Sequence, residues 1–290
     1  MELAVISGKG GTGKSSITAA FATLGKEVVV ADCDVDAANL YLLFNPAHEK
    51  SEVYIGGHKA VIDQSLCTVC GICESYCRFD AIYERNGRVI ISETACDGCF
   101  LCSRICPVDA ITMVRSDKSR MYSGTFRNGM MVYGRLAPGE ENSGKLVNLV
   151  REEAKRLSQE RGLDTVLLDG PPGIGCPVIS TVTGVDKIVI VTEPTMSALA
   201  DLKRVHEVAR KFSGEVGVII NKYDLNEPMA DRIEGWCAAQ ETTILGRLPF
   251  EKKVTESMVD GKSIAELYPE SEISKTLGVI WNKLISNGKE

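Results

Sequence analysis

Apolar residues in this chain occur in short continuous runs separated by segments of helical period. One run precedes residue 8, and others lie at residues 28–32, 165–169, 188–192, 216–221 and 243–248. The runs are rich in β-branched residues and do not alternate with polar ones, as is typical of strands covered on both faces of a parallel sheet. Strands that alternate with helices in this way predict a doubly wound, mostly parallel α/β fold.

A cysteine-rich block interrupts this order. Eight of the 11 cysteines lie between Cys67 and Cys106. We therefore expect one α/β domain made of residues 1–57 and 117–290, with residues 58–116 inserted as a small α+β domain. Near the C-terminus, apolar residues from Ile273 to Leu284 have helical spacing. This spacing predicts a final helix packed on the core rather than a membrane-binding one.

Composition narrows the class of protein. The 290 residues are 44% hydrophobic and 25% charged with a net charge of −6, which is ordinary for a globular protein and does not favour a nucleic-acid binder. No run approaches the ~20 apolar residues that span a bilayer, and Met1–Ser7 leaves no room for a signal peptide. We expect a cytoplasmic protein without stable membrane insertion, whose many cysteines bind metal rather than form disulfides.

The first strand leads into a phosphate-binding motif. Gly8-Lys9-Gly10-Gly11-Thr12-Gly13-Lys14-Ser15 matches G-x-x-x-x-G-K-[ST] and lies between an apolar strand and a predicted helix. These eight residues and Ser16 are the nucleotide-binding candidates of the loop. Glycines let backbone N–H groups surround phosphate oxygens, and the helix N-terminus adds its positive dipole end. Lys14 is expected to neutralise β/γ-phosphate charge and Ser15 to bind Mg²⁺. The motif predicts a nucleoside triphosphate site.

Carboxylates follow two of the other predicted strands. Asp169 ends the run Thr165–Leu168, where it can reach Mg²⁺, and Asp32-Cys33-Asp34-Val35-Asp36 ends the second strand near the same edge. Asp32 is a further magnesium candidate, whereas Asp36 is equally well explained as a helix N-cap. Asn221-Lys222-Tyr223-Asp224 spells N-K-x-D, the pattern that GTPases use to read guanine, so both ATP and GTP stay open.

The cysteine block contains an internal repeat. Cys67, Cys70, Cys73 and Cys77 recur 29 residues later (96 − 67) as Cys96, Cys99, Cys102 and Cys106. Each half spells C-x₂-C-x₂-C-x₃-C, the bacterial two-cluster ferredoxin run in which the fourth cysteine binds the other cluster. Zinc sites more often use two separated C-x₂-C pairs. The pattern predicts two [4Fe–4S] clusters, the first held by Cys67, Cys70, Cys73 and Cys106 and the second by Cys77, Cys96, Cys99 and Cys102.

These motifs resemble the MinD/ParA/Mrp P-loop ATPases, the family that includes nitrogenase iron protein. The resemblance is carried by Lys9 in the phosphate loop and by the segments 32–34 and 169–173, which match the family's two switches. It implies ATP, Mg²⁺ and a nucleotide-dependent homodimer in which Lys9 reaches the partner's phosphates. It also implies that Asp34 positions the attacking water, and that Asn221, Pro249 and Phe250 lie against adenine.

Cys176 follows Asp169 by seven residues, the spacing at which nitrogenase iron protein and its relatives place a ligand of an intersubunit cluster. In those proteins the second ligand is the cysteine of a Pro-Gly-x-x-Cys-x-Gly segment. Residues 138–144 of this chain resemble that segment, but Asn142 stands in place of the cysteine. We therefore expect no permanent third cluster, although a transient metal or cargo at Cys176 stays open.

Together these features predict an ATPase whose nucleotide-driven dimer switch controls electron transfer through two clusters to a redox or metal-cluster protein. An iron–sulfur assembly or carrier ATPase, similar to Mrp, is the first alternative. A positioning ATPase, similar to ParA or MinD, is the second.

Overall fold

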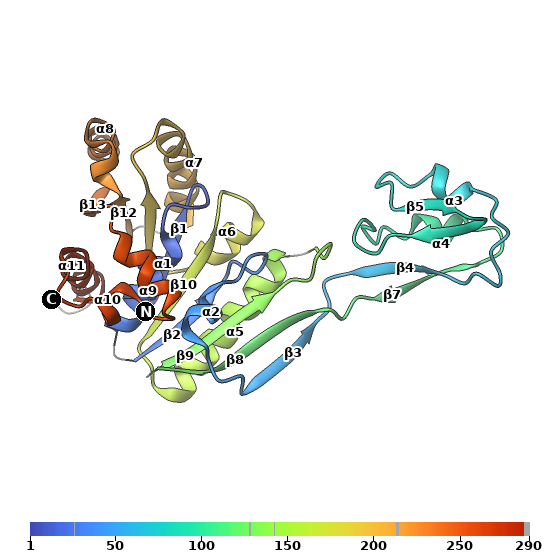
Figure 1. Ribbon diagram of the computed structural model, residues 1–290, viewed down its shortest axis with the longest axis horizontal. Helices are drawn as coiled ribbons and strands as arrows, with labels where there is room; N and C mark the ends of the chain where they lie inside the picture. Colours follow the sequence, from blue (N-terminus) through green and yellow to red (C-terminus); the bar gives the residue numbers. More distant parts are fainter. Residues whose placement is uncertain (26, 128, 142, 213–214, 287–290) are drawn as a thin grey trace.

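The computed structural model describes residues 1–286 except 26, 128, 142 and 213–214. Its centre is a nine-stranded sheet of order β13-β12-β11-β1-β10-β2-β9-β8-β3 (Figure 1). The strands from β13 to β9 run parallel, whereas β8 and β3 are antiparallel additions at one edge. The sheet strands are β1 (Glu2–Ser7), β2 (Val28–Asp32), β3 (Lys50–Tyr54), β8 (Ser119–Phe126), β9 (Gly129–Arg135), β10 (Thr165–Pro172), β11 (Lys187–Thr192), β12 (Glu215–Asn221) and β13 (Thr243–Leu248).

Helices cover both faces of this sheet, as the unbroken apolar strands require. On one face lie α5 (Ser143–Arg161), α6 (Cys176–Val182), α7 (Met196–Phe212) and α8 (Glu227–Ala239). On the other lie α1 (Lys14–Leu24), α2 (Leu40–Phe44), α10 (Ile264–Leu267) and α11 (Glu272–Ser286), with α9 (Lys252–Val259) beside them and a short 3₁₀ turn, η1 (Tyr223–Leu225), after β12. No described helix has the length and apolar character needed to cross a membrane.

The cysteine block projects from the antiparallel edge of the sheet. Strands β4 (His58–Ile62) and β7 (Ile111–Arg115) pair as an antiparallel stem, and residues 63–110 lie at its far end (Figure 1). There, α3 (Ile72–Ser75), the hairpin β5 (Ile82–Arg85) and β6 (Arg88–Ile91), and α4 (Leu101–Ile105) enclose a small core of their own. The proposed boundaries at residues 57 and 117 stay a proposal.

The mostly parallel α/β architecture confirms the fold predicted from the apolar runs. The final helix is packed as predicted, since Ile273, Leu277 and Trp281 on α11 are buried. One prediction is wrong: Asp36 does not cap a helix, because α2 begins at Leu40 with Asn39 at its N-cap. Strands β3, β8 and β9 escaped prediction because β3 is mostly polar and glycines interrupt β8 and β9.

Candidate functional site

The phosphate loop connects β1 to α1 through backbone that only glycine adopts easily. Gly11 and Gly13 have φ angles of 80° and 90°, in the left-handed region. A Cβ on Gly13 would lie 2.3 Å from Nδ2 of Asn221, so this glycine also permits close approach of β12. The loop therefore presents its backbone at the carboxyl edge of the sheet, where ligands bind in open α/β folds.

Lys14 and Asp169 form the electrostatic centre of the site. The Lys14 ammonium lies 2.7 Å from Oδ1 of Asp169, and the two side chains are 7% and 0% exposed. Asp169 also accepts hydrogen bonds from the hydroxyls of Ser15 and Thr18, each at 2.8 Å. A buried carboxylate is costly unless it is paired and hydrogen-bonded, and here both conditions are met. Sequence reasoning missed Thr18, although its position one turn after Lys14 was a usable signal.

Asp32 is a second buried carboxyl group beside this pair. It ends β2 directly opposite Asp169 in the register of β2 with β10. Its oxygens accept hydrogen bonds from the backbone N–H groups of Asp34, Asn39 and Leu40. Burial and then the charge of Asp169 raise the pKa of Asp32 to about 7, despite the opposing effect of Lys14.

The oxygens of Ser15, Asp169 and Asp32 are hard ligands of the kind that Mg²⁺ prefers. A cation near the two buried carboxylates would also neutralise charge that Lys14 alone does not balance. The residues present therefore fit a magnesium ion, as the sequence predicted for these three side chains.

Asp34 and Asp36 lie beyond Asp32 at the rim of the site. Burial raises the pKa of Asp34, and the nearby Lys14 opposes the rise. Asp34 lines the main pocket, whereas the Asp36 side chain is exposed. The structure thus brings Asp34, and not Asp36, to the phosphate loop.

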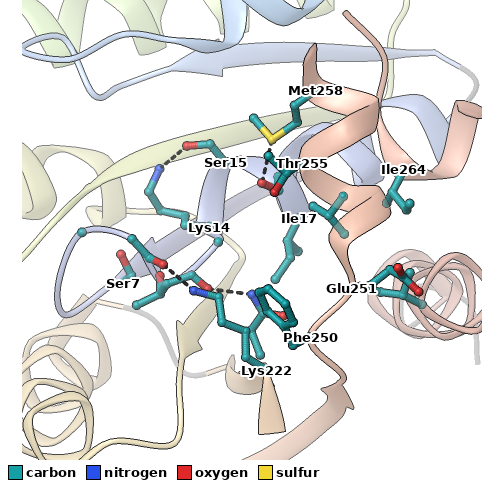
Figure 2. Close-up of a pocket in the computed structure, with 18 of the residues that line it drawn as sticks. Ser7, Lys14, Ser15, Ile17, Lys222, Phe250, Glu251, Thr255, Met258 and Ile264 are labelled. Atoms are coloured by element: carbon teal, nitrogen blue, oxygen red, sulfur yellow. Dashed lines mark hydrogen bonds between the residues drawn. The ribbon is translucent and has the colours of Figure 1, made fainter. Parts of the chain in front are cut away.

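A pocket of about 380 Å³ extends from the phosphate loop toward the C-terminal helices. Figure 2 shows Lys14 and Ser15 on the loop side, with Phe250, Thr255 and Met258 facing them from α9 and the segment before it. The size is typical of small-molecule sites. The other predicted nucleotide-binding residues that line it are Gly10, Gly11, Thr12, Gly13, Ser16, Asn221 and Pro249.

Two residues of the N-K-x-D segment support the loop rather than extend freely into the pocket. Asn221 donates its amide N–H to the carbonyl of Thr12 at 2.8 Å, and the Lys222 ammonium donates to the carbonyl of Gly11 at 2.9 Å. Asp224 accepts a hydrogen bond from the backbone N–H of Phe250 at 2.7 Å. All three side chains therefore position the walls of the pocket, and the role of Asn221 at a base stays a prediction.

Lys9 is held by Glu193, a residue that sequence reasoning missed. Its ammonium lies 2.7 Å from Oε1 of Glu193, which also pairs with Lys222 at 3.3 Å. Burial opposes ionisation of Glu193, but hydrogen bonds and charges from the two lysines outweigh it and lower the pKa. In this conformation Lys9 points at its own chain, and only the position of Glu193 just after β11 hinted at this contact.

The eight clustered cysteines line two neighbouring hollows in the inserted segment. One hollow is lined by Cys67, Cys70, Cys73 and Cys106, and the other by Cys73, Cys77, Cys96, Cys99 and Cys102. All eight are free thiols. Across the described residues, no three His, Cys, Asp or Glu side chains are arranged to hold a metal ion. The cluster assignments stay predictions.

Cys176 is an exposed free thiol at the start of α6. The Cβ position of Gly144, at the start of α5, lies 3.4 Å from its Cβ atom. Asn142, which the sequence places at the missing second ligand, lies outside the described residues. The two remaining cysteines, Cys33 and Cys237, are buried in the core.

We predict that Asp32 makes the stability of the nucleotide-free and metal-free protein depend on pH. Its raised pKa keeps a proton in the folded state that the unfolded chain loses above about pH 4. The free energy of unfolding should therefore fall as the pH rises from about 4 to about 7 and stay lower above it.

The free energy of unfolding of Asp32→Asn should not fall in this way. When unfolding by urea is measured in EDTA, wild type should lose a few kcal/mol more of that free energy between pH 5 and pH 8 than the variant does. Asp260→Asn, an exposed residue at the end of α9, is the control and should follow wild type. Equal pH dependence in wild type and Asp32→Asn would contradict the prediction.

Comparison with known proteins places this site in a family. Residues 3–264 match the model described as the CobQ/CobB/MinD/ParA nucleotide binding domain. A protein of Methanocaldococcus jannaschii is 40% identical over 229 residues, which cover 78% of this chain and 79% of the relative.

Two further proteins that are similar to this chain have names that point to different functions. A cytosolic Fe-S cluster assembly factor, the NUBP2 homolog of Trichoplax adhaerens, is 31% identical over 140 residues, 43% of this chain and 53% of its own length. The septum site-determining protein MinD of Pyrococcus horikoshii, solved with Mg-ADP, is similar with a TM-score of 0.58 at 19% identity, covering 99% of this chain and 96% of that one. The chain belongs to the CobQ/CobB/MinD/ParA family of nucleotide-binding P-loop proteins.

Proposed function

We propose that this protein is a Mg²⁺-dependent ATPase whose nucleotide-driven dimerisation controls one-electron transfer through two [4Fe–4S] clusters. The ATPase half is supported by the family, by the loop geometry and by the oxygens that face the magnesium position. Adenine is favoured over guanine because Asp224 is engaged with the backbone of Phe250 and is less free to read guanine's donors. The Mg-ADP complex of the similar MinD protein agrees with this choice.

For hydrolysis, Lys14 is expected to leave Asp169 and bind the β- and γ-phosphates, while Ser15, Asp32 and Asp169 hold Mg²⁺. Charge that develops on the transferred phosphoryl group is then neutralised by groups already in place. Asp34 is the carboxylate suited to orient the attacking water because it faces the pocket and stands near Lys14.

Lys9 provides the proposed link to a second subunit. In the present conformation its charge is satisfied by Glu193 of the same chain. A triphosphate from a partner subunit would compete with Glu193 for Lys9, so dimer closure would exchange an internal ion pair for one across the interface. This exchange makes the homodimer nucleotide-dependent.

The proposed electron transfer is supported mainly by the cysteines that line the two hollows. Each contains the four cysteines that the ferredoxin pattern assigns to one cluster, three from one half of the repeat and one from the other. Thiolates that surround a cubane are more widely spaced than ligands of one ion, so thiols spread around a hollow fit it. When bound, such clusters supply one-electron transfer from a reduced donor protein to an oxidised acceptor protein.

Two other functions have supporting observations. An iron–sulfur assembly or carrier role is favoured by the resemblance to the Fe-S cluster assembly factor and by the exposed Cys176, where a cargo metal could bind. A positioning role is favoured by the similarity to MinD proteins. In the first of these functions the clusters of the inserted segment would supply electrons, whereas the second gives its eight cysteines no role.

Asp34→Ala should slow ATP hydrolysis by about 100-fold or more, because it removes the group that orients water, and should leave ATP bound. Sedimentation velocity with Mg-ATP should then show an accumulated dimer, which the double variant with Lys9→Ala should lose. Asp36→Ala, in the same loop but exposed, should hydrolyse ATP like wild type. An Asp34→Ala protein that stays monomeric with saturating Mg-ATP would contradict the dimer switch.

Protein purified without oxygen should contain about eight irons and eight sulfides per chain, the content of two [4Fe–4S] clusters. Cys99→Ser should lower the iron content by about half, because the second cluster loses a ligand. Cys176→Ser is the matched control, since this thiol is also exposed and lies outside both sets. Zinc in place of iron, or full iron in Cys99→Ser, would rule out the proposed clusters.

A further inference from the structure

Lys59 is a buried lysine that joins the inserted segment to the rest of the protein. It lies on β4 with 6% of its surface exposed. Its ammonium donates to the carbonyl of Cys96 at 2.7 Å and to the carbonyl of Gly139 at 2.5 Å. Among the described residues, no carboxylate forms an ion pair with Lys59. One cation is thus shared by two backbone oxygens from distant segments.

The surrounding backbone is packed tightly at this junction. A Cβ on Gly98 would lie 2.3 Å from the carbonyl oxygen of His58, and one on Gly139 would lie 2.4 Å from that of Thr94. Across the same junction the neighbouring Asp97 carboxyl raises the pKa of Glu141, and the charge of Lys59 opposes this rise. The segment 92–99 therefore contacts the segment after β9 directly, in addition to its connection through the β4–β7 stem.

On one side of Lys59 lies a predicted ligand of the second cluster. Cys96 is buried and lines the hollow shared with Cys77, Cys99 and Cys102. A positive charge in a buried site favours the state with the extra electron, and hydrogen bonds and net charge near a cluster are known to tune its potential. Asp97 and Glu141 oppose this effect only in part, because Asp97 is half-buried and Glu141 is exposed, so that water and salt screen their charges.

On the other side lies a route to the nucleotide. Gly139 precedes α5, whose Gly144 packs against Cys176 and Ser180 of α6. Arg151 of α5 fixes the two helices further, since its guanidinium donates to the carbonyls of Ser180 and Thr183. Helix α6 begins four residues after Pro172, the last residue of the strand that carries Asp169. Helix α5 itself begins four residues after Gly139, so a movement of α6 with the nucleotide would reach the backbone that Lys59 holds.

We propose that Lys59 raises the electron affinity of the second cluster, and that its bond to Gly139 lets the nucleotide site change that affinity. This inference rests on the proposed function and specifies its regulation: the second cluster, rather than the first, responds to nucleotide. Lys59 positions the backbone of Cys96 and places its positive charge near the second cluster.

The test is a potentiometric titration of the full-length, iron-loaded protein with dithionite, followed by EPR, with and without a non-hydrolysable Mg-ATP analogue. The signal that Cys99→Ser removes belongs to the second cluster. Lys59→Met should weaken the electron affinity of that cluster about tenfold, a shift of about 59 mV for a one-electron couple. It should leave the first cluster unchanged and abolish the shift caused by nucleotide.

Lys59→Arg keeps the charge and should behave like wild type. Lys118→Met is the matched control, because Lys118 is an exposed lysine that pairs with Glu93 beside the same segment. It should change neither cluster. If Lys59→Met loses iron from the second cluster alone while Lys59→Arg stays loaded, the contact with Cys96 is supported.

Two results would overturn the inference while leaving the proposed function intact. In the first, Lys59→Met has about eight irons and the wild-type potentials. In the second, Lys59→Met and Lys118→Met shift both clusters equally. A wild-type protein without iron would instead overturn the proposed clusters and, with them, this inference.

Discussion

Two carboxylates buried side by side against a single lysine are the constraint on which the nucleotide site depends. Asp32 and Asp169 stand opposite each other at the ends of β2 and β10, and Lys14 neutralises only one negative charge. Burial and then the charge of Asp169 raise the pKa of Asp32 to about 7, so that its charged form is disfavoured unless a cation lies near. In the proposed mechanism, Mg²⁺ would neutralise these carboxylates and the phosphates would attract Lys14, so the two bind together.

Other lysines in the proposed mechanism are also held by polar groups of the same chain. Glu193 holds Lys9 as Asp169 holds Lys14, so both loop lysines are occupied by internal partners that a triphosphate can replace. Farther away, Lys59 joins the backbone of the cysteine segment to the backbone leading into α5. The two loop lysines would exchange one set of polar partners for another, whereas Lys59 would keep its two carbonyls.

Much of the fold was predictable because continuous β-branched runs leave few alternatives to a buried parallel sheet. Lys14, Ser15 and Asp169 were found because a local motif and the ends of strands determine their positions. The contacts of Glu193, Thr18 and Lys59 were not found. Each depends on residues that are far apart in sequence, and no local pattern distinguishes a lysine that bridges two carbonyls from one that faces solvent. The strands β8 and β9 were missed because glycines interrupt their apolar pattern.

The most direct test of the central claim is the proton balance of nucleotide binding. Calorimetric titration of preformed Mg-ATP at about pH 6.5, in buffers of different ionisation enthalpy, measures the protons released. A cation beside Asp32 favours its charged form, so wild type should release a proton and Asp32→Asn should not. If the binding heat of wild type does not depend on the buffer, no proton is released. Asp32 then does not become charged when the metal binds, which would contradict the account.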